Sequence, residues 1–141
     1  DPVSKLLLKT RPDRLLGDTV FDIKTTQDAS PSGFLKDCVK YWYFLQGAHY
    51  VYTCQLAGYD VTEFNFIACE KSAPYISHVH VMGPEIMEWA TVKLHETLAV
   101  IAKAEDAMEY NTGWGDYTII EKPKWLWVSQ QNKKVGLVRM K

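Results

Sequence analysis

An aspartate and a lysine occupy alternate positions of a short, otherwise apolar run, Val20-Phe21-Asp22-Ile23-Lys24-Thr25. The alternation predicts a β-strand in which Asp22 and Lys24 share one face. A second acid, Asp13, follows Pro12 one short hydrophobic stretch earlier, and a hairpin would bring it towards Asp22. Two converging carboxylates form a hard-oxygen site suited to Mg²⁺, with Mn²⁺ as a substitute. The lysine beside them can position a water and offset phosphate charge.

The same residues also have a purely structural interpretation. Asp22 and Lys24 can form an ion pair at a sheet edge, with Asp13 in a turn, and a D-x-K sequence alone is common. The order of the elements is more specific, because a proline–aspartate pair precedes the D-x-K strand and a long helix follows it. On that helix Gln46 and Tyr50 lie four residues apart and therefore share a face.

This pattern resembles the PD-(D/E)XK nuclease motif, with Pro12-Asp13 followed by Asp22-Ile23-Lys24. The Q-x-x-x-Y spacing of Gln46 and Tyr50 resembles the RecB-like branch of that superfamily. Within it, the chain is similar to the RecE-type (exonuclease VIII) and related phage-type exonuclease domains. The similarity also includes Lys122-Pro123-Lys124-Trp125 near the end of the chain.

The resemblance implies a Mg²⁺-dependent exodeoxyribonuclease that hydrolyses linear double-stranded DNA from a free end, 5′ to 3′, in recombination or end resection. It further implies a homo-oligomeric ring around the duplex and a single-strand annealing protein as partner. Two alternatives remain open. One is an endonuclease or other end-processing nuclease on the same scaffold, and the other is a non-catalytic DNA-binding or assembly module.

The resemblance also implies roles for individual residues. Asp13, Asp22 and the backbone carbonyl of Ile23 would hold metal, and Lys24 would serve the attacking water. Members of this family use one further acidic or histidine residue from a helix before the first strand. We expect either that this residue lies upstream of the chain or that the active site is incomplete.

Three more residues are expected at the substrate. The resemblance implies that Gln46 and Tyr50 line the site and contact DNA. Arg14 flanks Asp13, and we expect it to contact phosphate rather than only pair with a carboxylate.

The composition is that of one ordinary globular domain. The chain has 141 residues and a net charge of −1, so any basic surface for DNA must be local. Cys38, Cys54 and Cys69 lack metal-binding spacing, which predicts reduced thiols in a cytoplasmic protein. The resemblance implies that this protein is bacterial or phage-encoded. No apolar run reaches membrane-spanning length, so no membrane partner is expected.

The elements that must position these residues follow from periodicity. Strands are predicted at 3–9, 19–25, 63–69 and 75–82, the first two joined by a turn at Leu16-Gly17-Asp18, and helices at 34–57 and 83–109. The order ββαββα predicts an α/β (α+β) fold with a mixed sheet flanked by helices, the PD-(D/E)XK core, over residues 1–110. Residues 111–141 are predicted to be a tail that packs on the core or on a neighbouring subunit. Its Trp125 and Trp127, set among lysines, would contact either DNA or that subunit.

His78 and His80 share a face of the fourth predicted strand. This spacing can chelate zinc, but the sequence shows no third ligand nearby, so a structural pair is the preferred interpretation.

Overall fold

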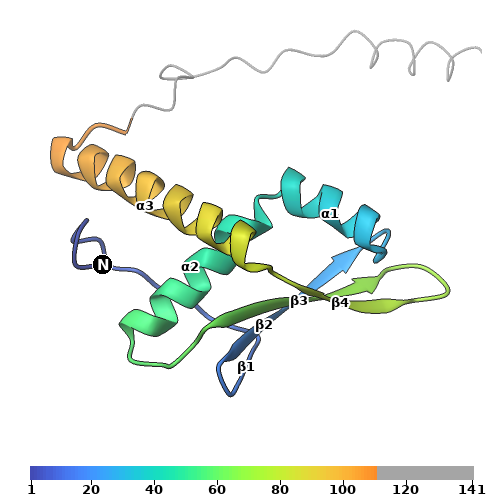
Figure 1. Ribbon diagram of the computed structural model, residues 1–141. Coiled ribbons are helices and arrows are strands. Elements are labelled where there is room, and N and C mark those ends of the chain that lie inside the picture. The colour runs from blue at the N-terminus through green and yellow to red at the C-terminus, as the bar shows by residue number, and fades with distance from the viewer. Residues whose placement is uncertain (111–141) are drawn as a thin grey trace, which may run out of the picture. The chain divides into compact units, whose positions relative to one another are not determined.

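The computed structural model describes residues 1–110, and its sheet begins with a hairpin of unequal strands. β1 (Arg14–Leu16) and β2 (Thr19–Thr26) pair antiparallel around a tight turn in which Gly17 has a φ of +60°. Such a φ favours glycine, because it has no Cβ to clash. β3 (Glu63–Glu70) then runs parallel to β2, and β4 (Ser77–Val81) pairs antiparallel with β3. The sheet is therefore mixed, in the order β1-β2-β3-β4 (Figure 1).

Three helices complete the described part of the chain: α1 (Pro31–Lys40), α2 (Tyr43–Leu56) and α3 (Pro84–Ala107). α1 begins where the Ser30 hydroxyl accepts a hydrogen bond from the Gly33 amide at 3.1 Å, with Pro31 in the first turn. α1 and α2 cover one face of the sheet, and α3 packs along α2 (Figure 1).

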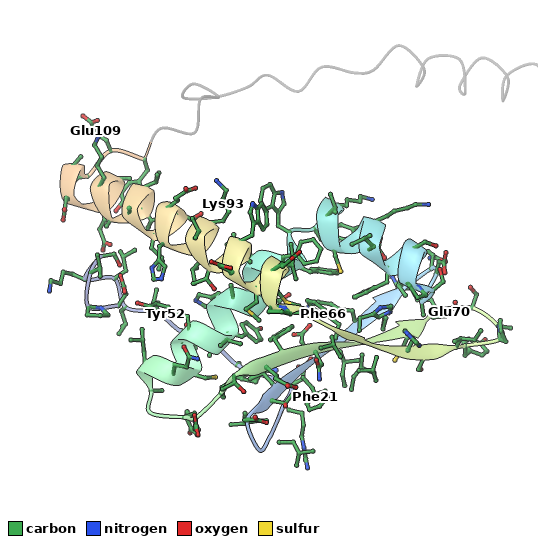
Figure 2. All side chains as sticks on the ribbon, in the orientation of Figure 1. Phe21, Tyr52, Phe66, Glu70, Lys93 and Glu109 are labelled. Atoms are coloured by element: carbon green, nitrogen blue, oxygen red, sulfur yellow. The ribbon has the colours of Figure 1, made fainter. Side chains whose placement is uncertain are left out.

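The core lies between this sheet face and the helices. Val20, Phe64 and Phe66 point towards the helices and are almost completely buried. The Phe66 ring meets Phe64 edge-on, with centroids 4.9 Å apart, and meets Phe34 of α1 at 5.5 Å. Asp22, next to Val20 on the same face, is only 4% exposed, so a carboxylate sits inside an apolar layer. Phe66 of this layer lies between the sheet and the helices (Figure 2).

Gly47 lets α2 lie close to the sheet. A Cβ added there would fall 2.3 Å from the Met82 sulfur and 3.1 Å from a Phe64 ring carbon. Any larger residue would push the helix outwards or displace Met82. Gly47 thus determines how close its sequence neighbour, Gln46, lies to the sheet.

The strand predicted at residues 3–9 is wrong. Lys5 has a φ of 62°, and its amide donates to the Asp1 carbonyl in a turn. The segment that follows is extended, and Leu6 and Leu8 face the core while Leu7 is 99% exposed. The exposure of this extended segment alternates, but within residues 1–110 it pairs with no strand. The first strand is β1, which begins at Arg14.

The single helix predicted at residues 34–57 is also wrong, because Trp42 breaks it with a left-handed φ of 56°. That conformation costs a non-glycine residue about 1–2 kcal/mol. Aromatic packing on both sides of the break offsets this cost. The Trp42 ring stacks on Trp89 of α3 at 6.3 Å, and Tyr43 turns inwards to lie 5.8 Å from Phe66. The observed order is ββααββα.

The remaining element predictions agree with the structure. The strands predicted at 63–69 and 75–82 correspond to β3 and β4, and the last helix corresponds to α3. Cys38, Cys54 and Cys69 are free thiols. Within residues 1–110 there is no helix with the length and apolar character needed to cross a membrane. The predicted tail, with Trp125 and Trp127, lies outside the described residues.

Candidate active site

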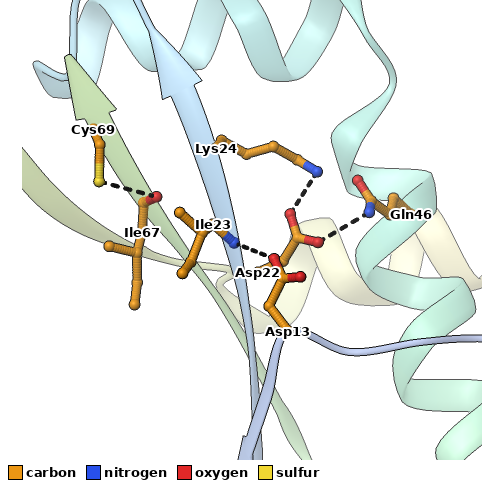
Figure 3. A network of polar contacts seen from close by, with 7 residues as sticks. All are labelled: Asp13, Asp22, Ile23, Lys24, Gln46, Ile67 and Cys69. Carbon is orange, nitrogen blue, oxygen red and sulfur yellow. Dashed lines mark hydrogen bonds and ion pairs between the residues drawn. The ribbon is translucent and has the colours of Figure 1, made fainter. Parts of the chain in front are cut away.

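The Asp22 carboxylate is held between two side chains that the sequence singled out. Lys24 Nζ lies 2.5 Å from Asp22 Oδ2, and Gln46 Nε2 donates to Asp22 Oδ1 at 3.2 Å (Figure 3). Strand alternation places Asp22 and Lys24 on one face, as predicted. The structure shows that this is the face covered by the helices, where Gln46 of α2 contacts Asp22. Both partners are needed because a buried carboxylate without them would be strongly destabilising.

Asp13 lies at the outer edge of β2, immediately beside Asp22 (Figure 3). β1 pairs with β2 only as far as Phe21, so the edge of β2 is open from Asp22 onwards. There Asp13 Oδ2 accepts a hydrogen bond from the Ile23 amide at 2.8 Å, in the place where a longer β1 would have supplied a carbonyl. The N–H and C=O of one strand residue point to the same edge, so the Ile23 carbonyl also faces Asp13.

Tyr43 belongs to this site and was missed by the sequence analysis. Lys24 Nζ lies 4.7 Å from the centre of the Tyr43 ring, a cation–π distance. Burial, with smaller contributions from nearby charges including that of Asp37, raises the pKa of the Tyr43 hydroxyl. The ring therefore stays neutral. Helical spacing could have found it, because Tyr43, Gln46 and Tyr50 lie at i, i+3 and i+7 of one helix.

Tyr50 and Arg14, which were also predicted to contact DNA, are less directly connected to the Asp22 carboxylate than Gln46 is. Tyr50 packs edge-on against Phe64, with centroids 5.9 Å apart, and is half-buried. Arg14 is exposed on β1, and it lines with Asp13 and Lys9 a cavity of about 540 Å³ beside the hairpin. Contact of Tyr50 and Arg14 with DNA stays a prediction.

The oxygen atoms at this site provide some, but not all, of the ligands that a hard divalent cation needs. Among residues 1–110, no three His, Cys, Asp or Glu side chains gather into a metal site. Asp22 Oδ2 is buried and, apart from the Lys24 ion pair, receives no hydrogen bond from this part of the chain. Asp22 Oδ2, the Asp13 carboxylate and the Ile23 carbonyl are the oxygen ligands that Mg²⁺ prefers. These three groups could hold part of the coordination shell of such an ion.

His78 and His80 form a pair, with ring centroids 4.7 Å apart. The His80 ring stacks on Phe34 at 4.5 Å, and its Nε2 lies 3.1 Å from the Ala29 carbonyl. Burial lowers the pKa of His80, with a smaller effect from His78. These contacts agree with the structural interpretation of the pair.

A family model described as "PDDEXK-like domain of unknown function (DUF3799)" matches residues 2–116. The chain belongs to this PDDEXK-like family. The matched region includes Asp13, Asp22, Lys24 and Gln46, so the family assignment and the clustered side chains concern the same part of the molecule.

One solved structure similar to this PDDEXK-like chain is a "putative exonuclease" from Eubacterium rectale. The TM-score is 0.53 at 14% sequence identity, and the match covers 78% of this chain and 46% of that one. This chain thus spans less than half of the length of that protein, and the likeness supports the fold. No curated protein matched the chain.

Proposed function

We propose that this PDDEXK-like protein is a metal-dependent nuclease that hydrolyses phosphodiester bonds of DNA. The observation that carries the proposal is the Asp22 carboxylate, buried in an apolar sheet face and held by Lys24 and Gln46, with Asp13 beside it at an open strand edge. A structural ion pair alone does not require a second carboxylate at the same edge.

Each residue has a role in this proposal. Asp13, Asp22 and the Ile23 carbonyl bind Mg²⁺, or Mn²⁺ in its place, and the bound ion supplies Lewis acidity at the scissile phosphate. Lys24 orients the attacking water and offsets charge that develops on the phosphate oxygens. Gln46 fixes the Asp22 carboxylate through the hydrogen bond to Oδ1, as partners of metal ligands commonly do.

The substrate we propose is linear double-stranded DNA with a free end, degraded 5′ to 3′ in recombination or end resection. The RecE-like sequence pattern supports this choice, and the Eubacterium rectale structure has the same fold and is called an exonuclease. A homo-oligomeric ring and a single-strand annealing partner belong to the same proposal.

A non-catalytic DNA-binding or assembly module is the second candidate. It is favoured by the incomplete ligand set, because among the described residues no three candidate ligands come together. This candidate predicts DNA binding without metal-dependent hydrolysis.

The test is hydrolysis of a 5′-phosphorylated linear duplex by the full chain, with Mg²⁺ and with EDTA, comparing the wild type with Asp22→Asn. Asparagine keeps an oxygen for Gln46 but removes the charge. Activity should fall by more than about 100-fold, because altering even the partners of metal ligands costs 10–100-fold. Asp60→Asn, which changes an exposed acid, is the matched control.

Three results would contradict the proposal. Equal activity of Asp22→Asn and the wild type would remove the metal-site assignment. Binding of DNA by a folded wild type without any hydrolysis would favour the non-catalytic module. Cutting of covalently closed circular DNA as fast as linear DNA would exclude the exonuclease.

A further inference from the structure

Four side chains form a continuous row that starts at the proposed active site, in the order Lys24, Tyr43, Tyr41 and Lys40. Lys24 Nζ lies 4.7 Å from the Tyr43 ring centre. The Tyr43 and Tyr41 rings stack with centroids 5.5 Å apart and an interplanar angle of 29°. Lys40 Nζ lies 4.9 Å from the Tyr41 ring centre. We call this row the tyrosine strip.

The outer end of the tyrosine strip is open to solvent. Tyr41 is 52% exposed and Lys40 is exposed, whereas Tyr43 is half-buried beneath them. Lys40 is an exposed lysine and is therefore cationic at neutral pH. The acid closest along the chain, Asp37, accepts a hydrogen bond from Thr26 Oγ1 at 2.6 Å. The exposed end of the strip therefore combines an aromatic face with a positive charge.

Tyr41 also lines a groove whose wall includes Gln46 of the candidate site. The groove has a volume of about 580 Å³ and is bounded by residues 6–9, α2 and α3. Its walls include Leu45 and Leu94, and its polar lining includes Gln46 and His49. This volume lies within the range of small-ligand sites. Apolar walls with polar groups between them suit a nucleobase, which has apolar faces and a polar edge.

We propose that Tyr41 is a stacking platform for an unpaired nucleotide of the strand being cut. Aromatic faces interleaved with cations are how proteins hold single strands without reading their sequence. Lys40 Nζ, which lies over the Tyr41 ring in the free protein, would move off the ring to make room for the base and would contact the phosphate that follows it. The strip would then lead the strand to Lys24 and Asp22. This inference rests on the proposed nuclease function and deepens it, because it makes a single-stranded or frayed end the form of DNA that enters the site.

The experiment measures binding by the full chain in EDTA, so that no hydrolysis occurs. The probe is a fluorescent single strand roughly 12 nucleotides long, within the site sizes of single-strand binding proteins. Tyr41→Leu removes the aromatic face, Tyr41→Trp restores it, and Tyr75→Leu alters another exposed tyrosine away from the strip. A base stacked on a tyrosine contributes a 5- to 150-fold change, so Tyr41→Leu should raise the Kd by about tenfold. Tyr41→Trp and Tyr75→Leu should bind like the wild type.

A second measurement reports stacking itself. A strand containing 2-aminopurine should lose fluorescence on binding to the wild type and to Tyr41→Trp, and should keep it with Tyr41→Leu at saturating protein. The proposal would be overturned if a folded Tyr41→Leu protein bound and quenched the strand like the wild type. It would also be overturned if Tyr75→Leu lost as much affinity and quenching as Tyr41→Leu. These measurements need no metal and no cleavage. They can therefore refute the stacking proposal separately from the hydrolysis test with Asp22→Asn, which addresses the nuclease function.

Discussion

The buried ion pair between Asp22 and Lys24 leads to a specific prediction about the free energy of unfolding. Lys24→Met removes the ammonium and leaves the Asp22 side chain, which is 6% exposed, with Gln46 as its one remaining partner in the described residues. Breaking one side of a buried ion pair typically costs 3–5 kcal/mol. Gln46 keeps donating to Oδ1, so the lower end of this range, about 3 kcal/mol, is expected for the loss in unfolding free energy.

The double variant Asp22→Asn/Lys24→Met separates the loss of stability from the loss of DNA hydrolysis. Both charges are gone, and the asparagine oxygen can still accept from Gln46 Nε2. Replacing a buried pair by neutral groups is often close to neutral, so the double variant should lie within about 1 kcal/mol of the wild type. It should nevertheless hydrolyse no DNA.

The assay is urea unfolding followed by circular dichroism, with Tm as a second readout. For a chain of this size, 3 kcal/mol corresponds to a drop of roughly 10 °C in Tm. If Lys24→Met costs less than about 1 kcal/mol, the pair behaves like an exposed one and the burial argument is refuted. If the double variant is as unstable as Lys24→Met, the loss comes from packing and not from an unpaired charge.

Three further predictions concern residues around the site. Gln46→Leu should lower the DNA hydrolysis rate by about 10- to 100-fold, because it frees the Asp22 carboxylate to turn; a rate equal to that of the wild type would exclude the positioning role. Gly47→Ala should cost about 1–3 kcal/mol in urea unfolding through its clash with Met82, and a shortened Met82→Ala partner should relieve it; an unchanged midpoint in the single variant would contradict the close approach of α2. Burial lowers the pKa of His80 below its ordinary 6.5, so its contribution to stability is present above pH 6.5 and is lost as the pH falls through the lowered value. Thermal melts from pH 7.5 to 5 should therefore show a smaller decline for His80→Phe than for the wild type, and parallel curves would contradict this assignment.

Much of the site could be predicted because its geometry is local. Strand parity alone puts Asp22 and Lys24 on one face, and a tight hairpin returns Asp13 to the neighbourhood of the same strand. The side chain of Gln46 required more, because its place depends on how deeply α2 sits on the sheet. That depth is set by Gly47 against Met82, a contact 35 residues apart in sequence that no periodicity reports.

The errors have a common physical origin. Residues 3–9 are rich in aliphatic side chains, as strands are, but such a composition does not report whether a segment has a hydrogen-bonded neighbour. The run Lys40-Tyr41-Trp42-Tyr43 contains neither glycine nor proline, so nothing local marks the end of α1. The break exists because ring packing on α3 and on β3 outweighs an unfavourable φ at Trp42, which is a tertiary effect.

The three-residue length of β1 has a consequence for how this fold tolerates change. Because β1 stops opposite Phe21, the backbone of Ile23 stays uncovered and a side chain, Asp13, takes the place of the missing strand. Lengthening β1 by two residues, to Pro12, would pair it with Ile23 and would make the sheet more regular. It would also cover the strand edge at which the proposed function places the substrate phosphate. The aperture of the site is thus set by where a strand stops, and a gain in sheet regularity at this edge would close it.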